Sequence, residues 1–195
     1  VTNEDVDMLF GCTSSASASR VATTVSKQAD VTTMLGPAAS ASITSNSETC
    51  GEQVFRASEN VAMDARSGGK YVAENTDVES VYMYGADYSF GRSVVNNYRT
   101  VLEANGVEVV DEKFFERGYS EWQGPLDNAE SAGADGIVAG FTVQTLPAMF
   151  TAYLNGAYSY DVYGGVAAPI STRTQSRTPP AGQGGPLAEE EPPSS

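Results

Sequence analysis

A hydroxyl-rich segment near the start of the chain has residue types that bind anionic groups. Residues 11–15 are Gly-Cys-Thr-Ser-Ser, and an amphipathic helical pattern begins directly after them. The first turn of a helix has backbone N–H groups without partners and the positive end of the helix dipole. We therefore expect the hydroxyl of Ser14 or Ser15 to bind an anion. The alternative is that either serine only caps the helix.

Several kinds of catalytic chemistry are excluded by composition. The chain contains no histidine, so it cannot build a Ser-His-Asp triad, a Cys-His dyad or a histidine zinc site. It also lacks a GxGxxG motif opening a helix after a strand, and the GxxxxGK[ST] motif, which bind dinucleotides and nucleotide phosphates. We therefore expect no enzyme activity, no metal site and no cofactor.

Short apolar runs alternate with helical patterns along most of the chain. Strands are predicted at residues 8–10, 31–35, 54–56, 80–84, 107–115, 136–141 and 160–163, and helices at 14–28, 60–74, 91–105, 121–132 and 146–154. This alternation predicts an α/β fold with Rossmann-like parallel sheets and helices on both faces. Ligands of such sheets bind beyond the carboxyl ends of the strands. The expected functional edge is therefore formed by residues 11–15, 36–40, 85–91 and 140–142.

The chain is strongly acidic. It has 25 Asp+Glu against 11 Lys+Arg and a formal net charge of −14, and only three of the cations are lysines. This charge disfavours nucleic acid and anionic membranes as partners, because both require basic surfaces. An acidic, lysine-poor composition is typical of proteins in high salt, the alternative being an acidic protein from an ordinary medium. No apolar run is long enough to cross a membrane.

The two ends of the chain differ from its middle. Six of the nine prolines lie after Gly165, and the segment 166–195 has no helical or strand period. We interpret this segment as a disordered or non-native tail, with a linker to a partner as the alternative. At the other end, a buried strand is predicted almost at once and no signal-peptide pattern precedes it.

A series of segments in a fixed order resembles a known family. They read VDMLFGCTSSASA, VTTMLGPAASASIT, VFRAS, VYMYGADYSFGRS, LEANGVEVVDEKFF, YSEW and ADGIVAGF. From about residue 4 to Gly165 the chain resembles the type I periplasmic binding proteins, specifically the branched-chain amino-acid (Leu/Ile/Val) binding proteins of ABC transporters. With its acidic composition, it resembles a haloarchaeal-like member. The resemblance implies two α/β lobes joined by three crossovers, and an extracytoplasmic location, periplasmic, at the cell surface or lipid-anchored.

The resemblance also divides the chain into parts. It implies that residues 1–54 are the later part of lobe 1, that residues 55–165 are most of lobe 2, and that 166–195 lie outside both. VFRAS matches the first crossover. The first strands of lobe 1 and the return to it are then missing. We therefore expect an incomplete type I periplasmic-binding-protein fold, from the middle of a longer protein.

In lobe 1, the resemblance implies a carboxylate site made by two loops. It places the ligand carboxylate at Ser14 or Ser15 and at the following loop, which contains Ala38, Ala39 and Ser40. The family often has threonine where this chain has Ala39. Backbone N–H contacts survive that change, whereas a side-chain hydroxyl must come from Ser40.

In lobe 2, the resemblance implies an aromatic wall. Phe90 and Phe141 match aromatic residues that contact the ligand in the family, the alternative being plain core packing. The family's acidic residue for the ligand ammonium falls where this chain has Val166. Asp87 is an acid in the same loop as Phe90, and a turn or capping role is its alternative.

The two cysteines, Cys12 and Cys50, fall in adjacent loops of the implied lobe 1. An extracytoplasmic location implies an oxidising medium, in which we expect a disulfide between them. The alternative is two free thiols. A catalytic cysteine is not expected, because no histidine is present to activate it.

The function implied by the resemblance is solute binding for an ABC transporter. A branched-chain or related amino acid, or another small polar solute, would bind between the lobes by hinge closure and pass to the permease subunits in the membrane. One alternative is a sensory ligand-binding domain with the same fold. Another is an enzyme on a Rossmann-like sheet, which the absent histidine and phosphate loop disfavour.

Overall fold

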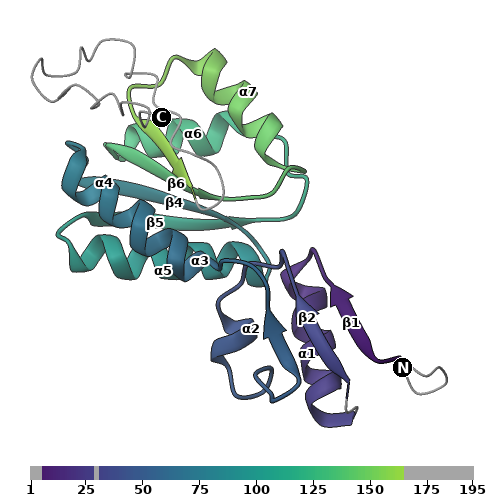
Figure 1. Cartoon of the computed structure of the whole chain (residues 1–195). Coiled ribbons are helices and arrows are strands. Elements are labelled where there is room, and N and C mark those ends of the chain that lie inside the picture. The colour runs from purple at the N-terminus through teal and green to yellow at the C-terminus, as the bar shows by residue number, and fades with distance from the viewer. Residues whose placement is uncertain (1–5, 29–30, 165–195) are drawn as a thin grey trace, which may run out of the picture.

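Two separate parallel sheets organise the chain in the computed structural model, which describes residues 6–28 and 31–164 (Figure 1). The smaller sheet has the strand order β1-β2-β3, and the larger has the order β5-β4-β6-β7. All strand pairs are parallel. The predicted α/β fold with parallel sheets is therefore confirmed. The predicted tail at 166–195 lies outside the described residues.

Lobe 1, as used below, is the smaller sheet with its helices. It consists of β1 (Met8–Gly11), α1 (Ser15–Gln28), β2 (Thr32–Leu35), α2 (Ser42–Ser45) and β3 (Val54–Arg56). The predicted division of the chain between residues 54 and 55 falls within β3.

One face of the lobe 1 sheet is covered. Ala18 and Ala22 of α1 are fully buried in a cluster with Leu35 and Val54 of the sheet. Burial of these apolar side chains holds the helix on the sheet. On the other face, Met8, Phe10 and Phe55 are exposed.

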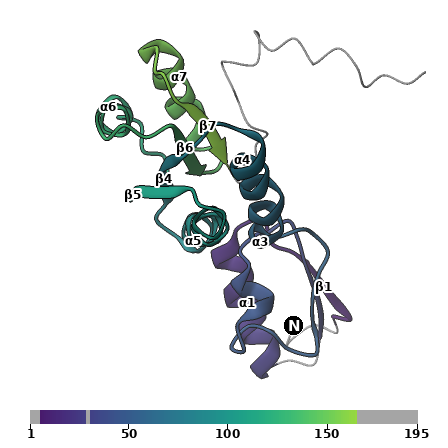
Figure 2. The same ribbon diagram turned by 90° about the vertical axis from the view of Figure 1, so that its left-hand side faces the viewer.

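Lobe 2 is the larger sheet, covered by helices on both faces (Figure 2). Its strands are β4 (Ser80–Ala86), β5 (Glu108–Phe115), β6 (Gly136–Gly140) and β7 (Asp161–Gly164). One face packs against α3 (Val61–Asp64), the π-helix η1 (Ala65–Gly69), α4 (Lys70–Asn75) and α5 (Ser89–Ala104). The other face packs against α6 (Gln123–Ser131) and α7 (Leu146–Gly156). Among the described helices, none is both long and apolar enough to cross a membrane.

The helix predicted over residues 60–74 is divided into α3, η1 and α4. The π-helical turn contains Gly68 and Gly69, at which α5 approaches closely. A Cβ atom at Gly68 would lie 2.7 Å from Tyr98 Oη, and one at Gly69 would lie 3.2 Å from a methyl of Val101. The glycines therefore let α5 pack against this turn. The short α2 lies outside the helices predicted from the sequence.

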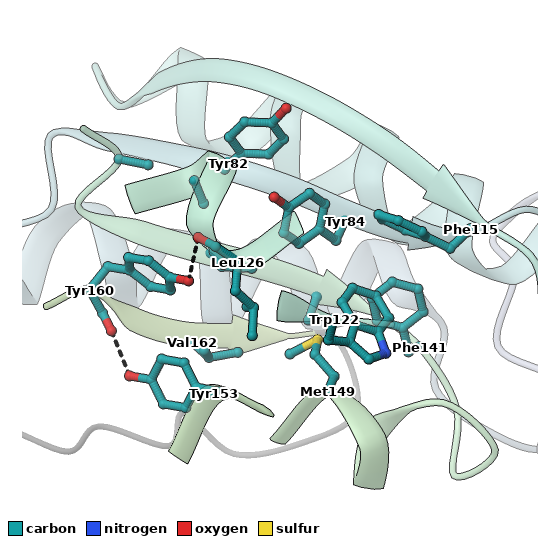
Figure 3. Close-up of a cluster of buried hydrophobic side chains, with 14 of the residues drawn as sticks. Tyr82, Tyr84, Phe115, Trp122, Leu126, Phe141, Met149, Tyr153, Tyr160 and Val162 are labelled. Atoms are coloured by element: carbon teal, nitrogen blue, oxygen red, sulfur yellow. Dashed lines mark hydrogen bonds between the residues drawn. The ribbon is translucent and has the colours of Figure 1, made fainter. Parts of the chain in front are cut away.

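An aromatic cluster forms the core between the lobe 2 sheet and helices α6 and α7 (Figure 3). Trp122 is completely buried there, and its ring centroid lies 4.8 Å from that of Phe115 and 5.0 Å from that of Phe141. Two hydroxyls of this core are paired with backbone carbonyls: Tyr153 Oη donates to Tyr160 O at 2.5 Å, and Tyr160 Oη donates to Leu126 O at 3.0 Å. Pairing removes most of the cost of burying the hydroxyls.

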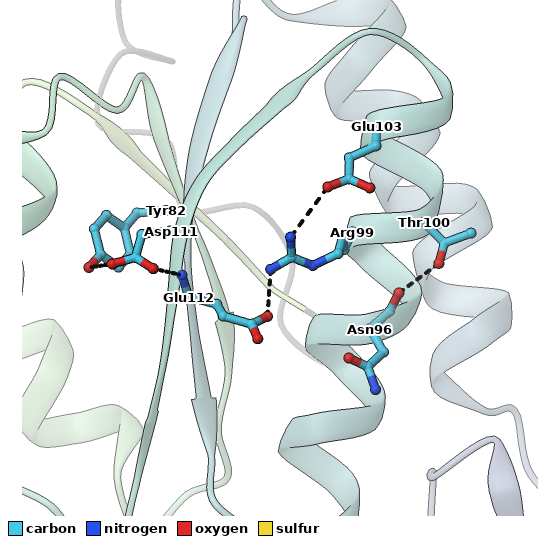
Figure 4. A network of polar contacts seen from close by, with 7 residues as sticks. All are labelled: Tyr82, Asn96, Arg99, Thr100, Glu103, Asp111 and Glu112. Atoms are coloured by element: carbon cyan, nitrogen blue, oxygen red, sulfur yellow. Dashed lines mark hydrogen bonds and ion pairs between the residues drawn. The ribbon is translucent and has the colours of Figure 1, made fainter.

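A polar network holds β5 against its neighbours, and β5 leads to the functional edge (Figure 4). Arg99 of α5 donates to Glu112 Oε2 at 2.6 Å and to Glu103 Oε1 at 3.3 Å. Tyr82 of β4 donates from Oη to Asp111 Oδ2 at 2.6 Å. This hydrogen bond is the main cause of the lowered pKa of the Asp111 carboxyl. The network therefore fixes β5 to both α5 and β4.

Because several tyrosines of lobe 2 are buried, we expect the folded protein to lose stability at alkaline pH. Burial raises the pKa of seven tyrosine hydroxyls above the usual value. The pKa reaches about 12 for Tyr82, Tyr98, Tyr158 and Tyr163, and it is also raised for Tyr84, Tyr88 and Tyr160. Unfolded tyrosine ionises near pH 10. Above that pH the unfolded state releases protons that the folded state keeps, so the stabilisation is complete below about pH 10 and is lost as pH rises through about 12.

Urea unfolding at pH 8 and pH 11 measures this effect. We expect a clearly lower midpoint at pH 11, and a native absorbance titration at 295 nm with most tyrosines still protonated at that pH. Equal midpoints, or ordinary titration of the tyrosines near pH 10 in the native protein, would contradict the account.

Candidate functional site

The carboxyl ends of strands from both sheets come together where lobe 1 meets lobe 2 (Figures 1 and 2). We call these loops the interlobe face; it consists of residues 11–15, 36–41, 86–93, 115–118 and 140–142. Hydrogen bonds connect its two sides, from Ala41 N to Ser93 Oγ at 3.1 Å and from Arg117 Nη2 to Ser14 Oγ at 3.4 Å. Beside the face, Val61 N of lobe 2 donates to Ala39 O at 2.9 Å. The edge predicted as functional in each lobe therefore faces the other lobe.

Ser14 and Ser15 have different surroundings. Ser15 is 2% exposed, and its Oγ accepts a hydrogen bond from Ser40 N at 3.1 Å. Ser14 directly precedes α1, its carbonyl accepts from Ala18 N at 2.9 Å, and its hydroxyl points toward Arg117 of lobe 2. Ser15 thus connects the two loops of lobe 1, whereas Ser14 presents its hydroxyl to the interlobe face.

The loop with Ala38, Ala39 and Ser40 is packed tightly within lobe 1. Ala38 and Ser40 are each 1% exposed, and Ala39 is half-buried. The N–H of Ala38 donates to Cys12 O at 3.2 Å, and that of Ser40 to Ser15 Oγ. The resemblance implied that backbone N–H groups of this loop donate to the ligand carboxylate. Two of these N–H groups already donate hydrogen bonds within lobe 1.

Arg56 orders this loop, and the sequence analysis did not identify it. Its guanidinium donates from Nη1 to Ala38 O at 2.5 Å and from Nη2 to Ser40 O at 2.7 Å. Burial lowers the pKa of Arg56. The available signal was a single arginine ending a short strand, Val54–Arg56, of otherwise apolar residues.

Phe90 and Phe141 lie in the two cores of lobe 2. Phe90 is 5% exposed in the cluster under α5, and Phe141 is 3% exposed against Trp122. Both rings therefore support the interlobe loops from behind. The burial of both rings agrees with the alternative stated above, in which they are part of the core. A direct ligand contact by either ring stays a prediction.

Tyr88 and Arg117 stand on the lobe 2 side of the interlobe face. The guanidinium carbon of Arg117 lies 3.8 Å from the centroid of the Tyr88 ring, a cation–π contact. Burial raises the pKa of Tyr88, while the Arg117 charge and a hydrogen bond with Thr142 act in the opposite direction. Asp87 forms an ion pair with Arg92 at 2.6 Å.

The predicted disulfide between Cys12 and Cys50 is wrong: both thiols are free. Cys12 follows β1 at the carboxyl end of the lobe 1 sheet, whereas Cys50 precedes β3 and so lies beyond the opposite end of the same parallel sheet. Crossing three or four residues of strand takes roughly 10 Å. A disulfide allows at most about 7 Å between Cα atoms.

A cavity of about 360 Å³ lies elsewhere, in lobe 2. It is lined by Ser67, Gly68, Tyr71, Val72, Tyr98, Tyr163 and Gly164. These residues belong to η1, α4, α5 and β7, and none belongs to the interlobe face. Within the described part of the chain, no group of three or more metal-ligating side chains occurs.

Comparison with known proteins identifies the family of the chain. A sequence model of the periplasmic binding proteins matches residues 1–184. The chain belongs to the periplasmic binding protein family. This confirms the resemblance to the periplasmic binding proteins; the haloarchaeal-like character and the branched-chain amino-acid ligand stay predictions. The family consists of binding proteins, which agrees with the expectation that the chain is not an enzyme. No curated protein sequence is similar enough to serve as a relative.

Solved structures of this family share the fold. A solute-binding protein of an ABC transporter from Rhodopseudomonas palustris, in complex with benzoate, has a TM-score of 0.75 at 21% identity and covers 83% of this chain and 44% of its own. A Leu-, Ile-, Val-, Thr- and Ala-binding protein from Brucella ovis has a TM-score of 0.71 at 20% identity, with 84% and 43% covered.

A substrate-binding protein from Desulfitobacterium hafniense in complex with Leu has a TM-score of 0.66 at 21% identity, with 82% and 46% covered. The chain thus spans 39% to 46% of the length of these and similar structures. At sequence identities of 20% to 21%, the similarity shows a shared fold.

Proposed function

We propose that the protein is the extracytoplasmic solute-binding component of an ABC transporter. It binds a small carboxylate-bearing solute, such as a branched-chain or related amino acid, at the interlobe face and delivers it to the permease subunits. Closure of the two lobes about the segment 57–60, which connects β3 to α3, completes the site.

The observation that carries the proposal is the position of Ser14. This hydroxyl lies at the start of α1, where the helix dipole favours an anion, and it faces the other lobe across the interlobe face. The structures with benzoate and with Leu contain ligands that share a carboxylate group. A carboxylate is therefore the ligand group that both the geometry and the family support.

The acidity of the chain fits this role outside the cell. With 25 Asp+Glu and 11 Lys+Arg, the protein carries a formal net charge of −14. We propose that this charge maintains solubility in a saline medium, where salt screens the repulsion between molecules.

Isothermal titration calorimetry tests the function. The protein expressed from its complete reading frame is titrated with leucine, isoleucine, valine and benzoate, and with glucose and AMP as ligands of other classes. We expect saturable heat with at least one of the four carboxylates. Binding of glucose or AMP alone would reject the ligand class, and no binding of any solute would reject the proposed function.

A further inference from the structure

We propose that Arg117 binds the ligand carboxylate from the side of lobe 2, opposite Ser14, and that it thereby selects carboxylate ligands irrespective of an amino group. This inference rests on the proposed function and adds a specificity-determining residue to it. In the structure, Arg117 Nη2 donates to Ser14 Oγ across the interlobe face. A carboxylate bound between these two side chains would replace that hydrogen bond and join the lobes.

The geometry holds the guanidinium ready for such a contact. Arg117 follows the end of β5, and its guanidinium carbon lies 3.8 Å from the centroid of the Tyr88 ring. An arginine that places its face on an aromatic ring keeps its N–H donors directed outward in the guanidinium plane. Those donors match the two oxygens of a carboxylate.

Tyr88 is itself fixed as the platform for this arginine. It is half-buried, forms a hydrogen bond with Thr142, and its ring centroid lies 6.0 Å from that of Phe90. Phe90 is buried in the core under α5. The position of the guanidinium is therefore set by the folded core of lobe 2.

The hydrogen bond to Ser14 is weak enough to be exchanged. Its length of 3.4 Å is well beyond the usual N–H···O distance of about 2.9 Å. A carboxylate carries the charge opposite to that of the guanidinium and can accept from two of its N–H groups at once, whereas the serine hydroxyl accepts from one. A ligand carboxylate is therefore a better acceptor for Arg117 than the Ser14 hydroxyl.

The charges around Arg117 leave it available for an anion. Among the described residues, no carboxylate lies within ion-pair distance of its guanidinium. Asp87, the acid of the neighbouring loop, is paired with Arg92. Arg56, which lies beside the interlobe face in lobe 1, donates to the carbonyls of Ala38 and Ser40. Arg117 is thus the cation of the described interlobe face that can receive a ligand anion.

The test compares three variants of the protein expressed from its complete reading frame. In Arg117→Gln the charge is removed, and in Arg117→Lys the charge stays without the planar donor pair. Arg66→Gln, at an exposed position of η1 outside the interlobe face, is the matched control in the same lobe. Leucine and benzoate are the carboxylate ligands, and leucinamide and benzamide are their uncharged-carboxyl counterparts. Thermal unfolding of each variant checks that it is folded.

We expect Arg117→Gln to raise the Kd of the bound carboxylate by about 10- to 100-fold, Arg117→Lys to have an intermediate effect, and Arg66→Gln to change it by less than about 2-fold. The amides should bind poorly to the wild type. Unchanged affinity in Arg117→Gln, or an equal loss in Arg66→Gln, overturns the role of Arg117 while solute binding stands. A wild type that binds no solute overturns the proposed function as well.

Discussion

Replacing Gly91 by alanine should remove at least about 3 kcal/mol from the free energy of unfolding, or prevent folding altogether. A Cβ atom at this position would lie 2.2 Å from Ala86 O and 2.3 Å from Ala86 N. These are backbone atoms at the end of β4, so no side chain can turn away to relieve the collision. Either α5 or the strand end would have to move, and both support the interlobe face.

Gly124→Ala is the matched control for this substitution. Gly124 lies in α6, it is exposed, and no atom lies within 4 Å of a Cβ built there. Alanine favours helix more than glycine does, but Pro125 follows and disfavours the helical conformation of a preceding alanine, so we expect a change of less than about 1 kcal/mol. Urea unfolding followed by circular dichroism gives both values. Similar effects of the two substitutions would contradict the close approach of α5 to β4.

Replacing Arg56 by methionine should weaken both the fold of lobe 1 and its ligand site. The change leaves the carbonyls of Ala38 and Ser40 without their charged donors. Ser40 O keeps a hydrogen bond from Ile43 N at 3.4 Å. A buried group left unpaired costs about 1–3 kcal/mol, so we expect a loss of about 1–3 kcal/mol in unfolding free energy. The apolar stem of methionine keeps part of the packing.

Ligand affinity should fall together with stability in this variant, because the loop that Arg56 holds also positions Ser15 through Ser40 N. We expect at least about a 10-fold increase in the Kd for the carboxylate found by calorimetry. Arg20→Met, at an exposed position on α1 of the same lobe, is the control and should leave the Kd unchanged. Normal affinity in Arg56→Met would show that the loop does not depend on this arginine.

The order of the elements follows from the sequence because each strand and helix has its own local pattern. The apolar runs and the helical periods of residues 91–105 and 14–28 are local features, so their positions could be predicted closely. The division of the helix predicted at 60–74 could not be, because it depends on the approach of α5 to Gly68 and Gly69. That approach joins segments far apart in the chain.

The loops predicted at the strand ends lie where the two lobes meet, but the directions of their side chains could not be predicted. Sequence could not decide between Ser14 and Ser15, since the decision depends on Ser40 N reaching one of them across the sheet edge. Arg56 and Arg117 could not be predicted for the same reason, because their partners are distant in sequence. Arg56 contacts Ala38 and Ser40. Arg117 contacts Ser14 and Tyr88. The predicted disulfide was wrong because the two cysteines were expected in adjacent loops. In the structure, β1 and β3 place them at opposite ends of the sheet.

Hydrogen exchange by mass spectrometry, with and without the carboxylate identified by calorimetry, tests the central claim most directly. If the ligand binds at the interlobe face, exchange should slow in peptides covering residues 11–15 and 36–40 of lobe 1 and 85–91 and 115–118 of lobe 2. Protection confined to peptides around Ser67, Tyr98 and Tyr163, which line the cavity in lobe 2, would contradict binding between the lobes.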